Sequence, residues 1–239
     1  MGKVIRAQRI GKAKRRMSLS HRAKGKPKHV SLKVSREKLV TGKVTDISHV
    51  PGRNTPVARV QYPNKEKGLL IAPLGLAVGD EITHGAKATI SKGSCVFVSQ
   101  IPEGTQVYNV ESFPGDGGKI GRSAGNTVRI VSHDVKGTVI QLPSGAFKTV
   151  NNQCRANIGV AAGGGQHEKP FVRAGAKRYS RYAKGKLHSI VCGVNMNPRD
   201  HPFGGGRHPH TGKGISVSRH APPGRKVGAI ASKRTGKKR

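Results

Sequence analysis

The sequence predicts a mainly β fold in which two small barrels follow one another between two long, irregular, basic extensions. Three observations predict this class. Short β-like runs separated by turn residues are confined to residues 37–160. These runs form two groups on either side of Gly85, which favours two small barrels over one sandwich. The flanking stretches 1–36 and 161–239 show no apolar period of a helix or strand.

Residues 1–36 form the first predicted extension. They hold 13 Lys and Arg residues, no Asp or Glu, and no aromatic residue. Charge of one sign at this density repels itself and opposes a compact state. We therefore expect an irregular arm that becomes ordered on a polyanion.

Residues 37–84 are predicted to form the first barrel. Side chains alternate within 55–62, where Ala58, Val60 and Tyr62 share one face and polar residues stand between them. Such alternation is typical of a strand with one buried face. The strands expected here are residues 39–49, 55–62, 67–72 and 79–85.

Residues 85–160 are predicted to form the second barrel. Pro143-Ser144-Gly145 separates its last two expected strands and is a strong hairpin signal. The Gly-rich stretch 113–126 reads as a long loop, and loops of that length in compact domains tend to be functional. The strands expected here are residues 94–100, 106–111, 127–133, 137–142 and 146–150.

Residues 161–239 form the second predicted extension, rich in Gly, His and basic residues. From 154 to the end the chain carries 19 Lys and Arg against two acids, whereas residues 37–153 carry 13 against nine. A short helix is predicted over 177–184. The formal net charge of +34 therefore resides mainly in the two extensions, and nucleic acid is the polyanion that most often neutralises such charge.

Cysteine usage and hydropathy favour a cytoplasmic protein. Cys95, Cys154 and Cys192 are far apart and odd in number, so they predict neither a disulfide framework nor a zinc site. The opening residues lack the apolar stretch of a signal peptide. The longest apolar run, 69–78, contains a proline and is too short to span a bilayer, so we expect no membrane contact.

The segment 195–214, NMNPRDHPFGGGRHPHTGKG, is the strongest candidate for nucleic-acid contact. Its consecutive glycines let the backbone approach another chain closely. Arg199, Arg207 and Lys213 supply positive charge, and Phe203 offers a surface on which a base or ribose can stack.

Three chemical alternatives for this segment are disfavoured. A Walker phosphate loop requires Ser or Thr where Gly214 stands. A metal site built from Cys192 and the histidines would need rigid supporting partners, which a Gly-rich arm supplies poorly. Asp200 and His201 are adjacent and point to opposite sides of an extended chain, and we expect no neighbour to fix the tautomer of His201. A histidine that donates to a phosphate or base is the favoured interpretation.

A second candidate is the basic and aromatic stretch around the predicted helix. Tyr179 and Tyr182 alternate with Arg178 and Arg181. These residues either dock on the protein's own barrel or contact RNA. RNA contact is favoured because the neighbourhood offers almost no apolar partner.

Several segments resemble one known family. GVNMNPRDHPFGGGRHPH, GVAAGGGQHEKP and PSGAFKTVNNQCRANIGV are similar to sequences of the universal L-two family of large-subunit ribosomal proteins. The opening MGKVIRAQRIGK and the closing APPGRKVGAIASKRTGKKR resemble its archaeal and eukaryotic branch. The resemblance covers essentially the whole chain and is weakest over 12–36.

The resemblance implies an OB-like barrel followed by an SH3-like barrel, and a structural protein rather than an enzyme. It implies that both barrels and both extensions bind large-subunit rRNA and that the protein supports subunit association. It further implies that the C-terminal extension, through residues 163–169 and 195–206, runs toward the peptidyl-transferase region. There His201 would hold rRNA geometry.

The expected domains and sites follow from both lines of reasoning. The domains are 1–36, 37–84, 85–160 and 161–239. No cofactor is expected beyond structural magnesium associated with the rRNA. The expected partners are large-subunit rRNA, other ribosomal proteins, and the small subunit at the intersubunit face. The residues expected to bind rRNA are Arg6, Arg9, Arg15, Arg16, Arg22, Gly163, Gly164, Gly165, His167, Lys169, Arg178, Tyr179, Arg181, Tyr182, Asn195, Asn197, Arg199, Asp200, His201, Phe203, Gly204, Gly205, Gly206, Arg207, His208, Lys213, Arg225 and Lys226.

Two rival functions come from other classes. A metal-dependent nuclease or hydrolase would need a carboxylate cluster, and only Asp200 lies within thirty residues of His201. A DNA-compacting protein would use its basic tails alone and would have no need of the DHPFGGG segment.

Overall fold

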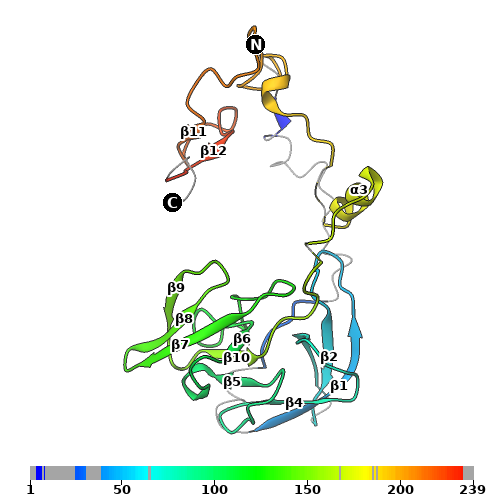
Figure 1. Ribbon diagram of the computed structural model, residues 1–239, viewed down its shortest axis with the longest axis vertical. Coiled ribbons are helices and arrows are strands. Elements are labelled where there is room, and N and C mark those ends of the chain that lie inside the picture. Colours follow the sequence, from blue (N-terminus) through cyan, green and yellow to red (C-terminus); the bar gives the residue numbers. More distant parts are fainter. Residues whose placement is uncertain are drawn as a thin grey trace. The chain divides into compact units, whose positions relative to one another are not determined.

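The computed structural model describes residues 4–6, 8, 25–30, 39–63, 66–166, 168–184, 186 and 188–233. The chain divides into two compact units (Figure 1). We call Ser20–Phe171 the globular unit, and Met1–Leu19 together with Val172–Arg239 the extension unit.

The first strands of the globular unit occur where the sequence predicts them. They pair in the order β3-β2-β1-β4, all antiparallel. The predicted alternation in β2 is confirmed: Val60 and the following Tyr62 are buried, while Arg59 and Gln61 are exposed. Their bounds are β1 Val40–Ser48, β2 Val57–Gln61, β3 Lys67–Ile71 and β4 Glu81–His84.

The second group contains the five predicted strands and one that sequence analysis missed. The missed strand, β10, is buried at every position although Arg155 and Asn157 alternate with Ala156 and Ile158, and so short a run containing Arg and Asn gives little strand signal. It pairs with both β5 and β6 and is therefore central to this group. The predicted hairpin between β8 and β9 is confirmed. The bounds are β5 Cys95–Phe97, η2 Val98–Gln100, β6 Gln106–Tyr108, β7 Val128–Asp134, β8 Gly137–Gln141, β9 Phe147–Val150 and β10 Arg155–Ile158.

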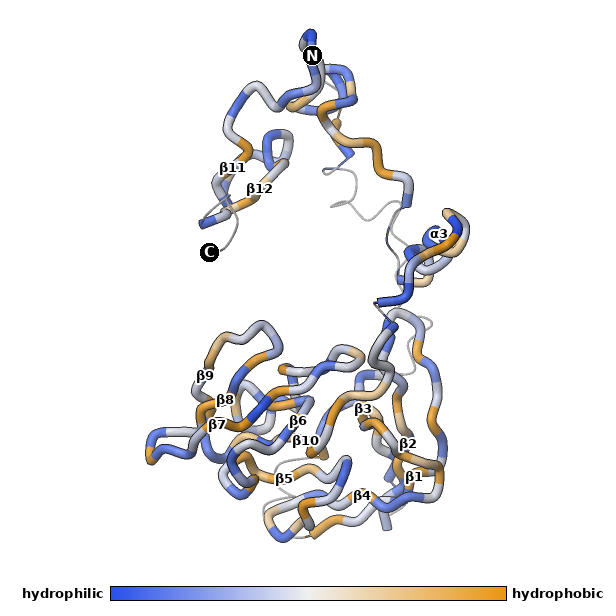
Figure 2. The backbone as a smooth tube through the Cα atoms, in the orientation of Figure 1, coloured by the Kyte–Doolittle hydropathy of each residue, from blue (hydrophilic) through white to orange (hydrophobic). Residues whose placement is uncertain are grey.

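The two groups have separate hydrophobic cores. Tyr62, Leu70 and Ile82 belong to the first core, and Ile130 and Ile140 to the second. Figure 2 shows hydrophobic residues recurring along the strands of both groups. Within the described residues strands β1–β10 form one sheet, in which the parallel β4–β5 bridge joins the two groups. An isolated antiparallel bridge between Pro73 and Ala161 links the chain after β3 to the chain after β10. The mainly β, two-barrel class is confirmed, while the domain boundaries stay predictions.

Residues 25–30, which we call the strap, pack against the barrels although sequence analysis gave no reason to expect it. The backbone N–H of Lys28 donates to the carbonyl of Leu69 at 3.0 Å. Arg122 Nη2 donates to the carbonyl of Pro27 at 2.7 Å, and Arg155 Nη1 donates to that of Val30 at 2.6 Å. The buried Arg155 and the half-buried Arg122 thus hold a segment that carries no apolar signal of its own.

A buried ion pair anchors this arrangement. Arg155 Nη2 lies 2.8 Å from Glu111 Oε1, and the two side chains are 2% and 0% exposed. The Glu111 carboxylate also accepts the backbone N–H groups of Gly115 and Gly117, both at 3.2 Å. Burial raises the pKa of Glu111, but the hydrogen bonds and charge of Arg155 outweigh it and hold this pKa below its usual value. The pair therefore stays ionised and satisfied.

Two histidines lie buried and neutral at the junction of the barrels. His29 Nε2 donates to the carbonyl of Asn109 at 2.7 Å, which leaves Nδ1 to accept the Cys95 thiol at 3.1 Å. Tyr62 Oη lies 3.2 Å from His84 Nε2. Burial, aided by the charge of Arg155, lowers the pKa of His29 to about 4. Burial, with smaller contributions from His29 and Arg155, lowers that of His84 to about 3.

Acidification is expected to destabilise the globular unit. Below pH 6.5 the unfolded chain binds protons at His29 and His84 that the folded chain excludes, so stability falls from there toward pH 4. One pKa unit corresponds to about 1.4 kcal/mol, which predicts a loss of several kcal/mol. Urea unfolding of the full chain across this pH range, followed by near-ultraviolet circular dichroism, measures the loss.

A matched pair of variants assigns this effect. His84→Gln keeps an acceptor for Tyr62 but cannot be protonated, so its stability should depend less steeply on pH. His220→Gln, at an exposed site, should retain the native dependence. An unchanged dependence in His84→Gln would show that other groups cause the acid sensitivity.

Candidate nucleic-acid interface

The helix α3, Ala174–Ala183, presents an aromatic and basic surface with nothing of it buried. Tyr179 and Tyr182 are 75% and 53% exposed. Arg178 and Arg181 lie among them at a spacing of three, which places like charges on neighbouring helix positions. The phosphates of a nucleic-acid strand on this surface would neutralise that repulsion, and the tyrosine rings offer surfaces on which its bases stack.

Residues 195–206, which we call the glycine loop, fold back on themselves. The Gly205 N–H donates to the Met196 carbonyl at 3.0 Å, and the Gly204 N–H donates to the His201 carbonyl at 2.9 Å. Gly205 has φ +81° and a side chain there would strike the ring of Pro198. Sequence analysis interpreted these glycines as points where a phosphate approaches the backbone closely. The fold of the loop itself also requires glycine at position 205.

His201 has a fixed tautomer, which corrects the expectation from sequence. Its Nδ1 accepts the backbone N–H of Phe203 at 3.0 Å, so the neutral ring carries its proton on Nε2. The ring centroids of His201 and Phe203 are 5.2 Å apart. The group that fixes the tautomer is the main-chain N–H two residues along the chain. A main-chain partner cannot be recognised from the spacing of side chains in the sequence.

Phe203 is only partly exposed, and the cause lies further along the chain. Short parallel strands β11, Ser216–Val217, and β12, Ala229–Ile230, bring Val217 and Val227 to a small hollow that Phe203 also lines. Val227 is buried. Sequence analysis missed this pairing because two-residue strands carry no period. The aromatic ring helps hold the extension unit together as well as offering a partial stacking surface.

The basic side chains of the extension unit greatly outnumber its acidic ones. Residues 172–239 hold 17 Lys and Arg and one acid, Asp200, which is half-buried. Arg199, Arg207, Lys213 and Arg225 are exposed. Positive charge that finds so few partners within the chain is suited to phosphates.

The remaining predicted residues divide between the two units. Gly163, Gly164 and Gly165 follow β10 in the globular unit, where a Cβ on Gly163 would lie 3.0 Å from the Asn54 carbonyl oxygen. Lys169, Asn195, Asn197 and His208 are exposed, and Arg6 and Lys226 are partly so. Five predicted residues lie outside the described part of the chain: Arg9, Arg15, Arg16, Arg22 and His167.

Metal-ligand clusters and membrane-spanning helices were both sought in the described ranges. There, no three His, Cys, Asp or Glu side chains are grouped closely enough to hold a metal ion. No described helix combines the length and hydrophobicity needed to cross a bilayer.

Comparison with known proteins matches both parts of the chain. Residues 1–84 match the family described as Ribosomal Proteins L2, RNA binding N-terminal domain, and residues 91–226 match its C-terminal domain. The chain is 50% identical over 241 residues to large ribosomal subunit protein uL2 of Methanothermobacter thermautotrophicus, covering all of both sequences. It is 50% identical to uL2 of Methanococcus maripaludis and 49% identical to uL2 of Methanosphaera stadtmanae, again over the whole of each.

Proposed function

The chain belongs to the ribosomal protein L2 family, and we propose that it is a structural, non-enzymatic constituent of the large ribosomal subunit in the cytoplasm. The observation that carries this proposal is that the chain is 50% identical in sequence to large-subunit ribosomal proteins over its full length. In this role both barrels and both extensions bind large-subunit rRNA.

The finer parts of the proposal rest on charge and exposure. The 28 residues predicted from sequence form the rRNA-binding set, with α3 and the glycine loop as its principal described elements. Other ribosomal proteins and the small subunit, at the intersubunit face, are further partners. Structural magnesium ions are bound by the rRNA, and the chain needs no cofactor of its own.

In this proposal His201 organises rRNA near the peptidyl-transferase region and performs no chemistry. Its Nδ1 is engaged by the Phe203 N–H, which leaves the Nε2–H to donate to an rRNA acceptor. A donor held in one orientation positions a partner, whereas a general base needs a free lone pair.

The test is His201→Ala in reconstituted large subunits. Removing Nδ1 leaves the Phe203 N–H without its acceptor and is expected to cost the glycine loop about 1 kcal/mol. Assembly should weaken or the chemical footprint of the neighbouring rRNA should shift, and any loss of peptide transfer should follow that defect. His201→Asn, which keeps an acceptor close to the position of Nδ1, should lose less.

Exposed His220→Ala provides the control and should leave assembly unchanged. The assignment fails if His201→Ala slows single-turnover peptide transfer strongly in fully assembled subunits whose footprints are native. That result would make the histidine part of the chemistry.

A further inference from the structure

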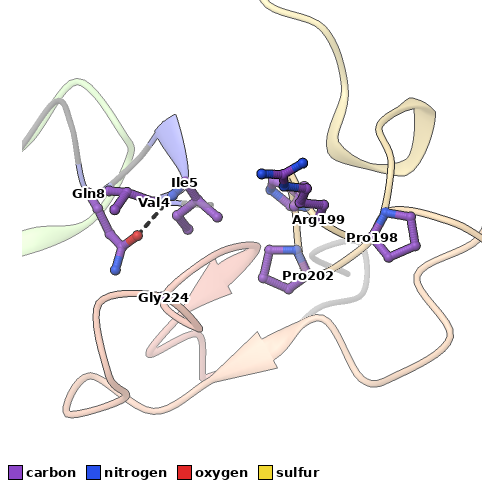
Figure 3. A pocket seen from close by; sticks show the side chains of 8 residues that line it. Val4, Ile5, Gln8, Pro198, Arg199, Pro202 and Gly224 are labelled. Carbon is purple, nitrogen blue, oxygen red and sulfur yellow. Dashed lines mark hydrogen bonds between the residues drawn. The ribbon is translucent and has the colours of Figure 1, made fainter. Parts of the chain in front are cut away.

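The extension unit contains an open cavity of about 370 Å³. Three separate stretches of chain line it: the N-terminal residues Ile5 and Gln8, the glycine loop through Pro198, Arg199 and Pro202, and Gly224. Figure 3 shows Ile5 and Gln8 on one side, across from Pro198, Arg199 and Pro202. A volume of this size accommodates a small organic group.

The walls combine apolar surfaces with hydrogen-bond donors. The rings of Pro198 and Pro202 and the side chain of Ile5 offer apolar contact, and Arg199 adds a planar cation at an exposed position. Arginine guanidinium groups stack on unstacked bases and also donate to their edges. The occupant must therefore be flat, partly apolar and equipped with acceptors.

Gln8 is held so that it donates into the cavity. Its Oε1 accepts the backbone N–H of Ile5 at 2.8 Å, drawn as the dashed line in Figure 3. Because a backbone N–H can only donate, this bond identifies the oxygen and leaves the Nε2 amide group with its two donors on the other side. That nitrogen faces Gly224, where a Cβ would lie 3.5 Å from it.

We propose that this cavity receives one unstacked guanine of the rRNA. The inference rests on the proposed function and specifies what part of the RNA enters the extension unit. Guanine presents O6 and N7 as neighbouring acceptors, which match donors from Gln8 and Arg199. Adenine would place its amino group against the same donors and is disfavoured.

The surroundings supply the charge that brings an RNA strand to the cavity. Exposed Arg225 follows Gly224 directly, and Arg6 lies between the two N-terminal lining residues in the chain. Only one acidic residue is found in 172–239, so the phosphates that flank the inserted nucleotide meet little repulsion from carboxylates. A polyanion is thus a better occupant than an apolar side chain of another protein.

Gly224→Leu tests the inference by filling the cavity. Gly224 does not have a left-handed backbone, and the nearest obstacle to a Cβ is Gln8 Nε2 at ordinary contact distance. Gln8→Glu is the second variant, because it keeps an oxygen for the Ile5 N–H and replaces the donor by an acceptor. His220→Leu, at an exposed site of the same unit and outside the predicted rRNA-binding set, is the matched control.

The measurement is guanine-specific chemical probing of large subunits reconstituted with each full-length variant. One guanine protected by the native chain should become reactive with Gly224→Leu and with Gln8→Glu, and stay protected with His220→Leu. Loss of such a base contact weakens the occupancy of the cavity by the guanine by about 5- to 150-fold.

The outcomes separate this inference from the proposed function. If the native chain fails to bind large-subunit rRNA, the proposed function itself is wrong. If all variants bind and give the native guanine pattern, only the cavity inference is wrong. A changed adenine alone, or a lost cross-link to another ribosomal protein with no changed guanine, would also overturn it.

Discussion

Binding of the chain to large-subunit rRNA should weaken by roughly 10³–10⁵-fold between about 50 and 200 mM salt, if six to ten phosphates are neutralised. The physical reason is counterion release, because each Lys or Arg that contacts a phosphate frees condensed cations. The extension residues 172–239 alone carry 17 such side chains against one acid. Filter binding or calorimetry with an rRNA fragment over a series of salt concentrations measures the slope.

Charge-matched variants locate the contribution of the extension unit. Replacing Arg199, Arg207 and Lys213 by Gln should lower the slope of log K against log salt by roughly 2 to 3, since each contact contributes about 0.7–0.9. The variant with Lys at all three positions keeps the charge and should keep the slope. A flat salt response of the native chain would mean that stacking or apolar docking dominates.

Glu111→Ala should lower the free energy of unfolding by about 3–5 kcal/mol, because it strands the buried Arg155 guanidinium without its counter-charge. It also removes the acceptor of the Gly115 and Gly117 N–H groups. The total free energy of unfolding of a folded protein is only about 5–15 kcal/mol, so this loss would be a large fraction of it. Urea unfolding of the full chain measures the change in midpoint.

The control is an ion pair of the same type at the surface. Arg59 Nε lies 3.7 Å from Asp46 Oδ2, and both side chains are 47% exposed. Asp46→Ala should change stability by no more than about 1 kcal/mol. Adding Arg155→Met to Glu111→Ala should recover part of the loss, because the unpaired charge is removed. Equal losses at the buried and the exposed pair would refute the structural role assigned to Glu111.

Local signals in the sequence predicted most of the fold. Alternation around Val60, turn residues at Pro143–Gly145 and the change of texture near Gly85 gave nine of the ten sheet strands, because each is a property of adjacent residues. β10 was missed because it is only four residues long and contains Arg155 and Asn157, types that are rarely buried, whereas the structure buries all four residues. The strap was missed because Arg122 and Arg155 hold it from about a hundred residues away.

The candidate interface was predicted in kind but not in detail. Basic and aromatic residues at Tyr179, Tyr182 and Arg199 indicated contact with a polyanion, since that depends on composition and exposure. The fixed tautomer of His201 depends on a turn that brings the Phe203 N–H to it. The cavity beside Pro202 depends on residues from both ends of the chain, and no local pattern encodes such a meeting.

Sedimentation of the chain in a cell extract after a high-salt wash tests most directly whether it is a structural protein of the large ribosomal subunit. We expect the chain to travel with large ribosomal subunits and with whole ribosomes, and to be released by ribonuclease treatment. Recovery at the top of the gradient, or with DNA after ribonuclease treatment, would contradict its assignment as a structural protein of the large subunit.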